Sequence, residues 1–540
     1  MLNYTKKLFA KLKVLKLNSI VGRFITHNKS VFVNPNSLQK RKSIILMELS
    51  SMQSSHIAYS YLGNALAREY NAKLVGYVPR VYSSNWKLFA FKIAKVLNLS
   101  YLSIYRSFGV SDFIAIEIND YQRKRAINIY NEIIGLIEEK RDVEQLCIHK
   151  VWVGDLIYDS YLARFKKPTI EKDNPNFKKF LLESIELFLF WESFLDDNDV
   201  RAINVSHCVY NVAMPLRIGV ERKIPIFQTN ATHIYRMTKK NLFAYNDFFY
   251  FRERFNALPE EVKTLGVEEA KRRINRRFAG EVGVDMAYSA KSAYGENRFE
   301  SLLVISTRKK ILIATHCFFD SPHSYGNNLF PDFYEWLDFL GKISEITDYD
   351  WYIKTHPDYI PGTMEIIEGF IQKYPKLTLL PSNASHHQII AEGIDVALTV
   401  YGTIAFEYAA LGITVINCSI NNPHIAYDFN VHPTSVEGYR QQLLGLNSLK
   451  FKIDKQQVYE YYFMKFIFNT EDLFFNNYEA LLKRLGGYPG QFTPDVYKEW
   501  MAEWTPSRHN LILEALQNYI RSGDFRMDYR HFGGDFAFSQ

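Results

Sequence analysis

The chain has 540 residues, 47% of them hydrophobic and 15% aromatic, which is ordinary for a globular protein and long enough for two domains or more. No apolar run of about 18 residues and no signal-peptide pattern occurs, so neither a membrane span nor secretion is expected. The four cysteines are scattered without a C-x-x-C pair. This spacing argues against a disulfide framework or a zinc site and favours a reducing cytoplasm.

The net charge of +7 comes from one end of the chain. Residues 1–47 contain ten Lys and Arg side chains and no acidic one, whereas the remainder carries 55 basic against 58 acidic side chains. A near-neutral body without a basic groove argues against nucleic acid as a partner. We call the basic residues 1–40 the leader. Within it, Leu8, Leu12 and Leu15 share a helical face among lysines. Two interpretations stay open for residues 1–24: a helix lying on anionic lipid, or a solvated tail.

The first half of the chain begins with the pattern of a Rossmann-like domain. An apolar strand at 43–49 precedes a polar loop, a helix over 56–70 and a second strand at 72–78. The loop lacks G-x-G-x-x-G, which argues against a dinucleotide site. The further elements expected in this half are helices at 86–99, 121–140 and 177–195 and strands at 202–206 and 225–228.

The second half repeats the alternation of strands and helices, which predicts a parallel sheet. The expected strands lie at 309–315, 351–353, 395–398 and 413–416, with a helix at 330–347 and helical patterns at 456–478 and 496–520. In open parallel sheets, ligands bind beyond the carboxyl ends of the strands.

Two motifs occupy these carboxyl ends. They consist of Lys354, His356 and Pro357 after one strand, and of Tyr401, Gly402, Thr403 and Glu407 at the start of a helix after another. The free amides and the dipole of a helix start favour a bound phosphate by about 0.3–1 kcal/mol when exposed. Glycine at 402 permits close approach of the backbone. We therefore predict that a phosphate binds between the two motifs, with residues 316–323 facing it.

The His-Pro pair after a strand, together with the Gly-Thr helix that carries Glu407, resembles the nucleotide-sugar half of GT-B glycosyltransferases. It is most similar to the bacterial capsule and surface-polysaccharide transferases, including the CMP-sugar users (Kdo and sialic-acid transferases). The resemblance is good over 300–440 and weaker over 41–235. It implies that His356 and Pro357 contact the nucleotide phosphate of the donor and that Glu407 lies near the ribose.

Pattern and resemblance together predict an α/β, GT-B-like fold. Two Rossmann-like domains would face each other across a cleft, with C-terminal helices crossing back to the first domain. The expected divisions are a basic leader at 1–40, an acceptor-side domain at 41–256, an interdomain segment at 257–300, a nucleotide-sugar domain at 301–455 and a C-terminal helical segment at 456–540.

Glycosyl transfer also requires a group that deprotonates the acceptor, or a carboxylate that attacks the sugar. Asp320 is the first candidate, and His316 and His323 are alternatives because histidine titrates near neutral pH. Asp155 and His207 are candidates from the facing domain. The sequence leaves this choice open, and with it the question of retention or inversion.

No metal and no resident cofactor are expected, since the nucleotide sugar is a substrate. Residues 197–199 (Asp-Asn-Asp) match the D-x-D of metal-dependent transferases, but their place between a helix and a strand favours a turn. The histidines and the carboxylate at 316, 320, 323 and 356 could suggest a metal site, yet Pro322 and its neighbours indicate a loop.

The expected function is that of a cytoplasmic glycosyltransferase, held at the inner face of a bacterial membrane if the leader binds lipid. It would transfer a sugar from a nucleotide-activated donor, with a CMP-sugar favoured, to a growing surface polysaccharide or glycolipid. The alternatives are a CDP-glycerol-type polyol-phosphate transferase, a UDP-sugar 2-epimerase and a non-catalytic scaffold of capsule assembly.

Overall fold

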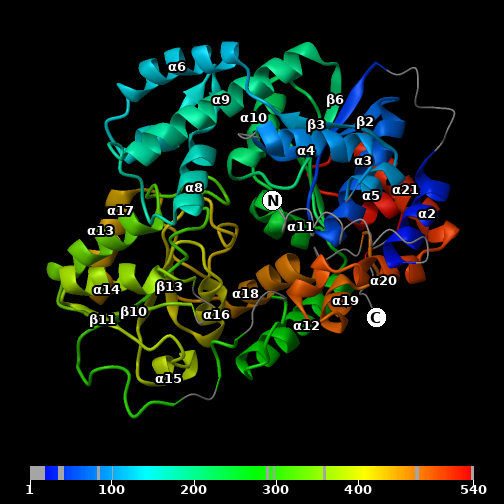
Figure 1. Ribbon diagram of the computed structural model, residues 1–540. Helices are drawn as coiled ribbons and strands as arrows, with labels where there is room; N and C mark the ends of the chain where they lie inside the picture. Colours follow the sequence, from blue (N-terminus) through cyan, green and yellow to red (C-terminus); the bar gives the residue numbers. More distant parts are fainter. Residues whose placement is uncertain are drawn as a thin grey trace.

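The computed structural model describes residues 19–33, 42–81, 85–99, 101–286, 291–295, 298–356, 360–468, 473–534 and 536. The chain forms two lobes, each built on its own sheet (Figure 1). Most of the predicted lipid-binding stretch, up to residue 18, and Pro357 lie outside the described residues. Among the helices of these ranges, none has both the length and the apolar character that crossing a membrane requires.

The N-terminal sheet has the strand order β3-β2-β1-β6-β7-β8, and every neighbouring pair except β7 and β8 is parallel. Its strands are β1 (Ile44–Glu48), β2 (Lys73–Val81), β3 (Val110–Ile116), β6 (Val200–Val205), β7 (Ile226–Thr229) and β8 (Ile234–Met237). The order reverses between β1 and β6, so the topological switch point lies at the carboxyl ends of these two strands.

Helices cover both faces of this sheet. One face packs against α2 (Ile20–Phe32), α3 (Gln53–Glu69), α5 (Leu102–Ser107), α20 (Asp495–Glu503) and α21 (Pro506–Ser522). The other packs against α6 (Asp120–Ile134), α8 (Gly154–Phe165), α9 (Pro175–Asp197) and α10 (Met214–Glu221). Further elements of this lobe are α4 (Asn85–Val96), α7 (Lys140–Glu144), β4 (Cys147–Ile148) and β5 (Val151–Trp152). Because α2 buries Phe24 and Phe32, part of the predicted leader belongs to the core of the domain.

The C-terminal sheet is entirely parallel, in the order β11-β10-β9-β12-β13. Its strands are β9 (Lys310–Ala314), β10 (Asp350–Lys354), β11 (Leu377–Leu379), β12 (Val396–Thr399) and β13 (Thr414–Asn417). One face packs against α13 (Phe333–Glu345), α14 (Thr363–Lys373) and α17 (Val436–Leu444), and the other against α15 (His386–Ala391) and α16 (Ile404–Leu411).

Helices also join the two lobes. In the predicted interdomain region, α11 (Phe251–Asn256) and α12 (Glu260–Phe278) pack with α18 (Lys455–Tyr462) and a π-helical segment at Phe463–Phe468. The helical pattern at 456–478 is interrupted, since α19 begins only at Tyr478 and runs to Arg484. The last helices, α20 and α21, return to the first lobe and lie beside α2, α3 and α5 (Figure 1). The predicted fold class, two Rossmann-like domains with C-terminal helices crossing back, is confirmed.

Candidate active site

The carboxyl edge of the second sheet brings the two sequence motifs together. Because β10 and β12 flank β9, Lys354 at the end of β10 and Tyr401 after β12 lie on either side of His316, which follows β9. The Nε2 of His316 accepts hydrogen bonds from the Val400 amide (3.2 Å) and the Thr399 hydroxyl (3.0 Å), and the charge of His356 acts on the same ring. The two motifs therefore share one corner of the sheet, which we call the donor corner.

His316 is neutral in this corner. Burial, assisted by the charge of His356, lowers the pKa of His316 to about 3. The ring stacks on Phe333 with centroids 4.6 Å apart, and its centroid lies 4.9 Å from that of Tyr401. With Nε2 already used as an acceptor, the arrangement favours a structural role for His316 over that of a base.

Gly402 and the start of α16 complete the donor corner. The Gly402 amide donates to the Thr399 hydroxyl at 3.1 Å, and a Cβ on Gly402 would lie only 2.8 Å from the same oxygen. Thr403 is the N-cap of α16, but its side chain makes no capping hydrogen bond. No side chain caps α16, whose Ala405 and Phe406 amides donate to the carbonyls of Gly402 and Thr403; the dipole of the helix start would still favour an anion at this edge.

Two buried polar side chains, those of Lys354 and Thr355, lie at the end of β10. Lys354 is 2% exposed and donates to the Ser382 carbonyl at 2.9 Å. Burial lowers the pKa of Lys354 to about 8, although Glu407 opposes the shift. The hydroxyl of Thr355 is buried and has no hydrogen-bond partner among the described residues. An unpaired buried hydroxyl costs free energy, which a bound ligand or water would relieve. His356 follows and is exposed.

Glu407 is held by the interdomain region. Its side chain is 4% exposed. The Tyr294 hydroxyl donates to Oε2 at 2.9 Å, and the Arg277 guanidinium lies 2.5 Å from Oε1. Neither partner could be assigned from the sequence, because both are more than a hundred residues away from Glu407. A ribose hydroxyl bound here would have to share the carboxylate with them.

A cavity of about 1400 Å³ opens at the carboxyl edge of the first sheet. Its walls are the segments that follow β1, β6 and β7, the helix α12, and parts of the chain between 466–492 and 529–536. Aromatic and amide side chains that line it include Tyr59, Asn230, Tyr245, Phe466, Tyr478 and Gln491. Rings and amides of this kind suit a hydroxyl-rich ligand.

Three residues connect this cavity to the second domain. The imidazole of His207 is surrounded by protein but remains exposed to the cavity. Burial lowers the pKa of His207, while the charge of Asp320 opposes the shift. The Tyr210 hydroxyl donates to Oδ1 of Asp320 at 2.5 Å. The exposed Asp320 carboxylate is therefore held at the first domain by Tyr210, near enough for its charge to act on the His207 imidazole.

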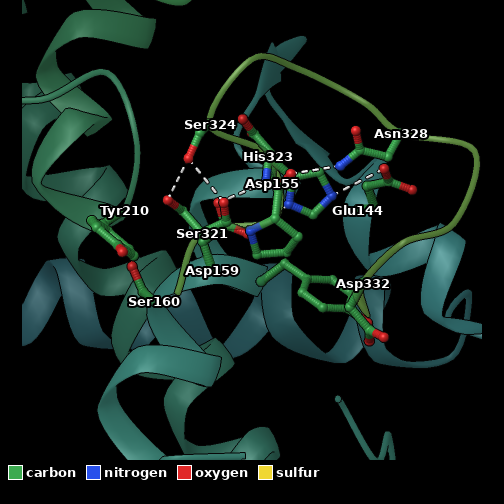
Figure 2. Close-up of polar contacts among 12 residues, drawn as sticks. Glu144, Asp155, Asp159, Ser160, Tyr210, Ser321, His323, Ser324, Asn328 and Asp332 are labelled. Carbon is green, nitrogen blue, oxygen red and sulfur yellow. Dashed lines mark hydrogen bonds and ion pairs between the residues drawn. The ribbon is translucent and has the colours of Figure 1, made fainter. Parts of the chain in front are cut away.

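Asp155 and His323, the other two candidate catalytic residues, are buried and form ion pairs. Asp155 lies 2.5 Å from the Arg217 guanidinium. His323 is 0% exposed, with Nδ1 2.6 Å from Asp159 and Nε2 3.0 Å from Glu144 (Figure 2). Neither lines the cavity. Of the proposed catalytic side chains, His207 lines the cavity and Asp320, although outside its lining, is exposed, whereas Asp155 and His323 are buried.

Glu48 is a functional candidate that sequence reasoning missed. It ends β1, and its carboxylate accepts from the hydroxyl (2.5 Å) and the amide (2.9 Å) of Ser206, which lines the cavity. Burial raises the pKa of Glu48 to about 7. Carboxyl groups with strongly shifted pKa values are concentrated at functional sites. In the sequence, Glu48 is only one polar residue at the end of an apolar run.

Residues 197–199 form a turn, as the sequence indicated. Asp197 ends α9, and the carboxylate of Asp199 accepts from the Ser43 hydroxyl at 2.6 Å and pairs with Arg201. Within the described ranges, no three His, Cys, Asp or Glu side chains are grouped so that they could hold a metal ion.

Comparison with known proteins gives a distant structural likeness. No family model and no curated protein matches the chain. Similar solved structures include KpsC, a beta Kdo 2,4 transferase from Thermosulfurimonas dismutans, at 12% identity over 52% of this chain and 85% of that one (TM-score 0.30). A putative UDP-N-acetylglucosamine 2-epimerase from Listeria monocytogenes is 10% identical over 91% and 100% of the two chains (TM-score 0.24). The UDP-GlcNAc 2-epimerase of Methanocaldococcus jannaschii, in complex with UDP-GlcNAc and UDP, is 12% identical over 77% and 97% (TM-score 0.24).

Proposed function

We propose that the protein is a GT-B glycosyltransferase that moves a sugar from a nucleotide-activated donor to a saccharide or glycolipid acceptor. The observation that carries this proposal is the presence of two sites at facing sheet edges. One is the anion-favouring donor corner of the second sheet, and the other is the cavity of about 1400 Å³ at the first sheet. Ligands of open parallel sheets bind at such edges.

The donor corner suits the phosphate of a nucleotide sugar. Lys354 supplies positive charge, Thr355 supplies an unpaired hydroxyl, and α16 begins at the same edge with the positive end of its dipole. A bound phosphate would favour the protonated form of Lys354. These groups would also stabilise the nucleotide phosphate as it leaves the sugar. The preference for a CMP-sugar rests on the resemblance of the motifs alone.

His207 and Asp320 suit the proton transfer. The acceptor hydroxyl oxygen would attack the anomeric carbon while the bond from that carbon to the nucleotide phosphate oxygen breaks. Neutral His207 would take the hydroxyl proton, and the Asp320 carboxylate would stabilise the resulting imidazolium. The nucleotide phosphate would leave with the bonding electron pair.

The size of the cavity favours transfer over epimerisation. An epimerase converts one nucleotide sugar and needs no acceptor site. Ligand pockets usually measure about 300–1,000 Å³, and this cavity of about 1400 Å³ adjoins the first domain, away from the donor corner. It therefore offers room for a separate acceptor.

Nucleotide binding and donor cleavage test the proposal. CMP-, UDP-, GDP- and CDP-linked donors would be titrated by calorimetry and then incubated without acceptor to detect hydrolysis. We expect one nucleotide to bind. Lys354→Ala should weaken that binding roughly ten- to hundredfold, since hydrogen bonds to charged groups contribute about 1.5–3 kcal/mol. The control is Lys376→Ala: Lys376 precedes β11 at the opposite edge of the same sheet and donates to the carbonyls of Glu345 and Thr347.

Each alternative predicts a different result. Cleavage of only a CDP-polyol donor would favour the polyol-phosphate transferase. Formation of an epimeric nucleotide sugar without acceptor would favour the epimerase. If the folded wild-type protein bound none of the four nucleotides, the transferase proposal would be wrong and the scaffold would remain.

A further inference from the structure

One loop of the second domain fastens the two domains together. Residues 320–335 contact α7, α8 and the segments after α8 and β6. The cross-domain polar pairs include Lys140 with Glu335, Arg141 with the Leu329 carbonyl, Glu144 and Asp159 with His323, Tyr158 and Thr169 with Asp332, and Tyr210 with Asp320. We call residues 320–332 the docking loop.

His323 is the most deeply buried member of the docking loop. Its Nδ1 lies 2.6 Å from Oδ1 of Asp159, and its Nε2 lies 3.0 Å from Oε1 of Glu144 (Figure 2). The backbone amide of His323 also donates to Asp159 at 3.4 Å. All three side chains are at most 1% exposed. One imidazole therefore joins two helices of the other domain.

The charges around His323 require it to be an imidazolium. Glu144 shares its second carboxylate oxygen with Arg141, and Asp155 is paired with Arg217. Asp159, however, has His323 as its only cationic partner among the described residues. A buried carboxylate without a cation is costly. Burial alone would lower the pKa of His323, but the carboxylates of Asp159 and Glu144 outweigh it and raise the pKa to about 10. The remaining titratable group packed on the ring is Tyr158, 5.5 Å away between centroids.

The turn that carries His323 also carries Asp320. The Asp320 carboxylate accepts from the Ser321 amide at 2.8 Å. The Ser321 and Ser324 hydroxyls are 2.7 Å apart (Figure 2). On its other side, the turn accepts a hydrogen bond from the Tyr401 hydroxyl to the Ser321 carbonyl at 3.1 Å. The turn is thus tied to the first domain through His323 and to the donor corner through Tyr401.

We propose that His323 is a positioning residue whose ion pairs with Asp159 and Glu144 hold the docking loop on the first domain and so keep Asp320 opposite His207. The inference rests on the proposed function, in which Asp320 and His207 are the proton-transfer pair. His323 itself touches no substrate, because both of its ring nitrogens are occupied.

The test is His323→Gln, assayed for nucleotide binding, transfer kinetics and hydrogen–deuterium exchange. Glutamine keeps a donor of similar reach but loses the positive charge. The donor corner lies wholly in the second domain, so the nucleotide Kd should stay within about twofold of wild type. The kcat for transfer should fall about a hundredfold, the loss expected when a reacting group moves by about 1 Å. Exchange should rise in α7, α8 and the docking loop but not in the second sheet.

A second variant covers the case in which His323→Gln does not fold. The double variant His323→Gln with Asp159→Asn leaves no unpaired buried charge at this position, and the same kinetic and exchange results are expected from it. His149→Gln is the matched control, because His149 pairs with Glu192 at the surface of the first domain, at 41% side-chain exposure. It should leave kcat unchanged.

The outcomes separate this inference from the proposed function. Unchanged kcat in a folded His323 variant that still binds nucleotide would overturn the positioning role and leave the transferase proposal intact. Unchanged exchange in the docking loop would also overturn it. If wild type bound no nucleotide, the proposed function would fail, while the exchange experiment would still decide whether His323 docks the loop.

Discussion

The donor corner and the cavity are built in opposite ways. The donor corner consists of residues at or just past the ends of strands, such as Lys354 at the end of β10 and Gly402 shortly after β12. The cavity combines strand ends of the first sheet with α12 and with C-terminal segments up to residue 536. A site of the first kind can be recognised in the sequence, because the order of strands fixes its position. A site of the second kind exists only after distant segments have packed together.

The largest expected effect concerns the base at the cavity. His207→Ala should lower the kcat for transfer by about 10²–10⁴-fold, the usual contribution of a positioned acid or base. Nucleotide binding should be unchanged because His207 belongs to the first domain. Steady-state kinetics with a saturating donor would measure the effect. A loss of nucleotide affinity in this variant would contradict the separation of the two sites.

A glycine substitution tests the donor corner, where nucleotide affinity and not transfer should change first. In Gly402→Ala, the new Cβ would lie 2.8 Å from the Thr399 hydroxyl, and overpacking of this kind costs about 1–3 kcal/mol. Nucleotide affinity should fall about tenfold, as measured by calorimetry. Gly369→Ala is the matched control, since Gly369 lies exposed in α14 with no atom within 4 Å of the added carbon. That change should be neutral or slightly stabilising. Equal nucleotide affinity in the two variants would rule out close packing at Gly402.

A smaller effect concerns the pH dependence of the stability that His323 contributes at the contact between the two domains. The pKa of His323 is raised to about 10 in the folded protein, against about 6.5 in an unfolded chain. Its contribution to stability is therefore complete below pH 6.5 and is lost as the pH rises to about 10. The difference in melting temperature between wild type and His323→Gln should shrink over this interval. A constant difference from pH 6 to pH 10 would show that the charge of His323 does not contribute.

The smallest expected effect on the two sites comes from the leader. Deletion of residues 1–18 spares α2, whose Phe24 and Phe32 belong to the core, so the melting temperature and transfer should not change. If the leader binds lipid, the deletion should reduce co-sedimentation with anionic vesicles, because each basic residue near such a surface contributes about 1 kcal/mol. Neutral vesicles are the control. Equal sedimentation of both proteins would favour a solvated tail.

Much of the second domain could be predicted because its strands are short, apolar and separated by clear helices. β9, β10, β12 and β13 all coincide with predicted strands. In the first domain, β3 was missed: it is an edge strand that carries exposed Asp112, a residue type depleted in strands. β8 was missed as well, since only its antiparallel pairing with β7 defines it.

For the candidate site residues, the sequence showed which side chains lie near the end of a strand. It did not show which of them are buried. Asp320 and His323 are three positions apart in one polar loop, yet one is exposed and the other is fully buried. The difference arises from Glu144 and Asp159 of the first domain, whose carboxylates bind the two ring nitrogens of His323. For the same reason, Arg277 and Tyr294 could not have been assigned to Glu407, because their contact depends on the path of the interdomain region.

The return of α20 and α21 to the first lobe has a consequence for synthesis on the ribosome. The second sheet is contiguous in the chain, so its strands can pair as soon as they emerge. The core beneath α3 instead waits for Trp500, Leu516 and Tyr519, which are translated only after the whole second sheet. The second lobe should therefore complete its folding before the first lobe, although the first lobe precedes it in the chain. Until then, the nascent first lobe exposes apolar surface that a chaperone would cover.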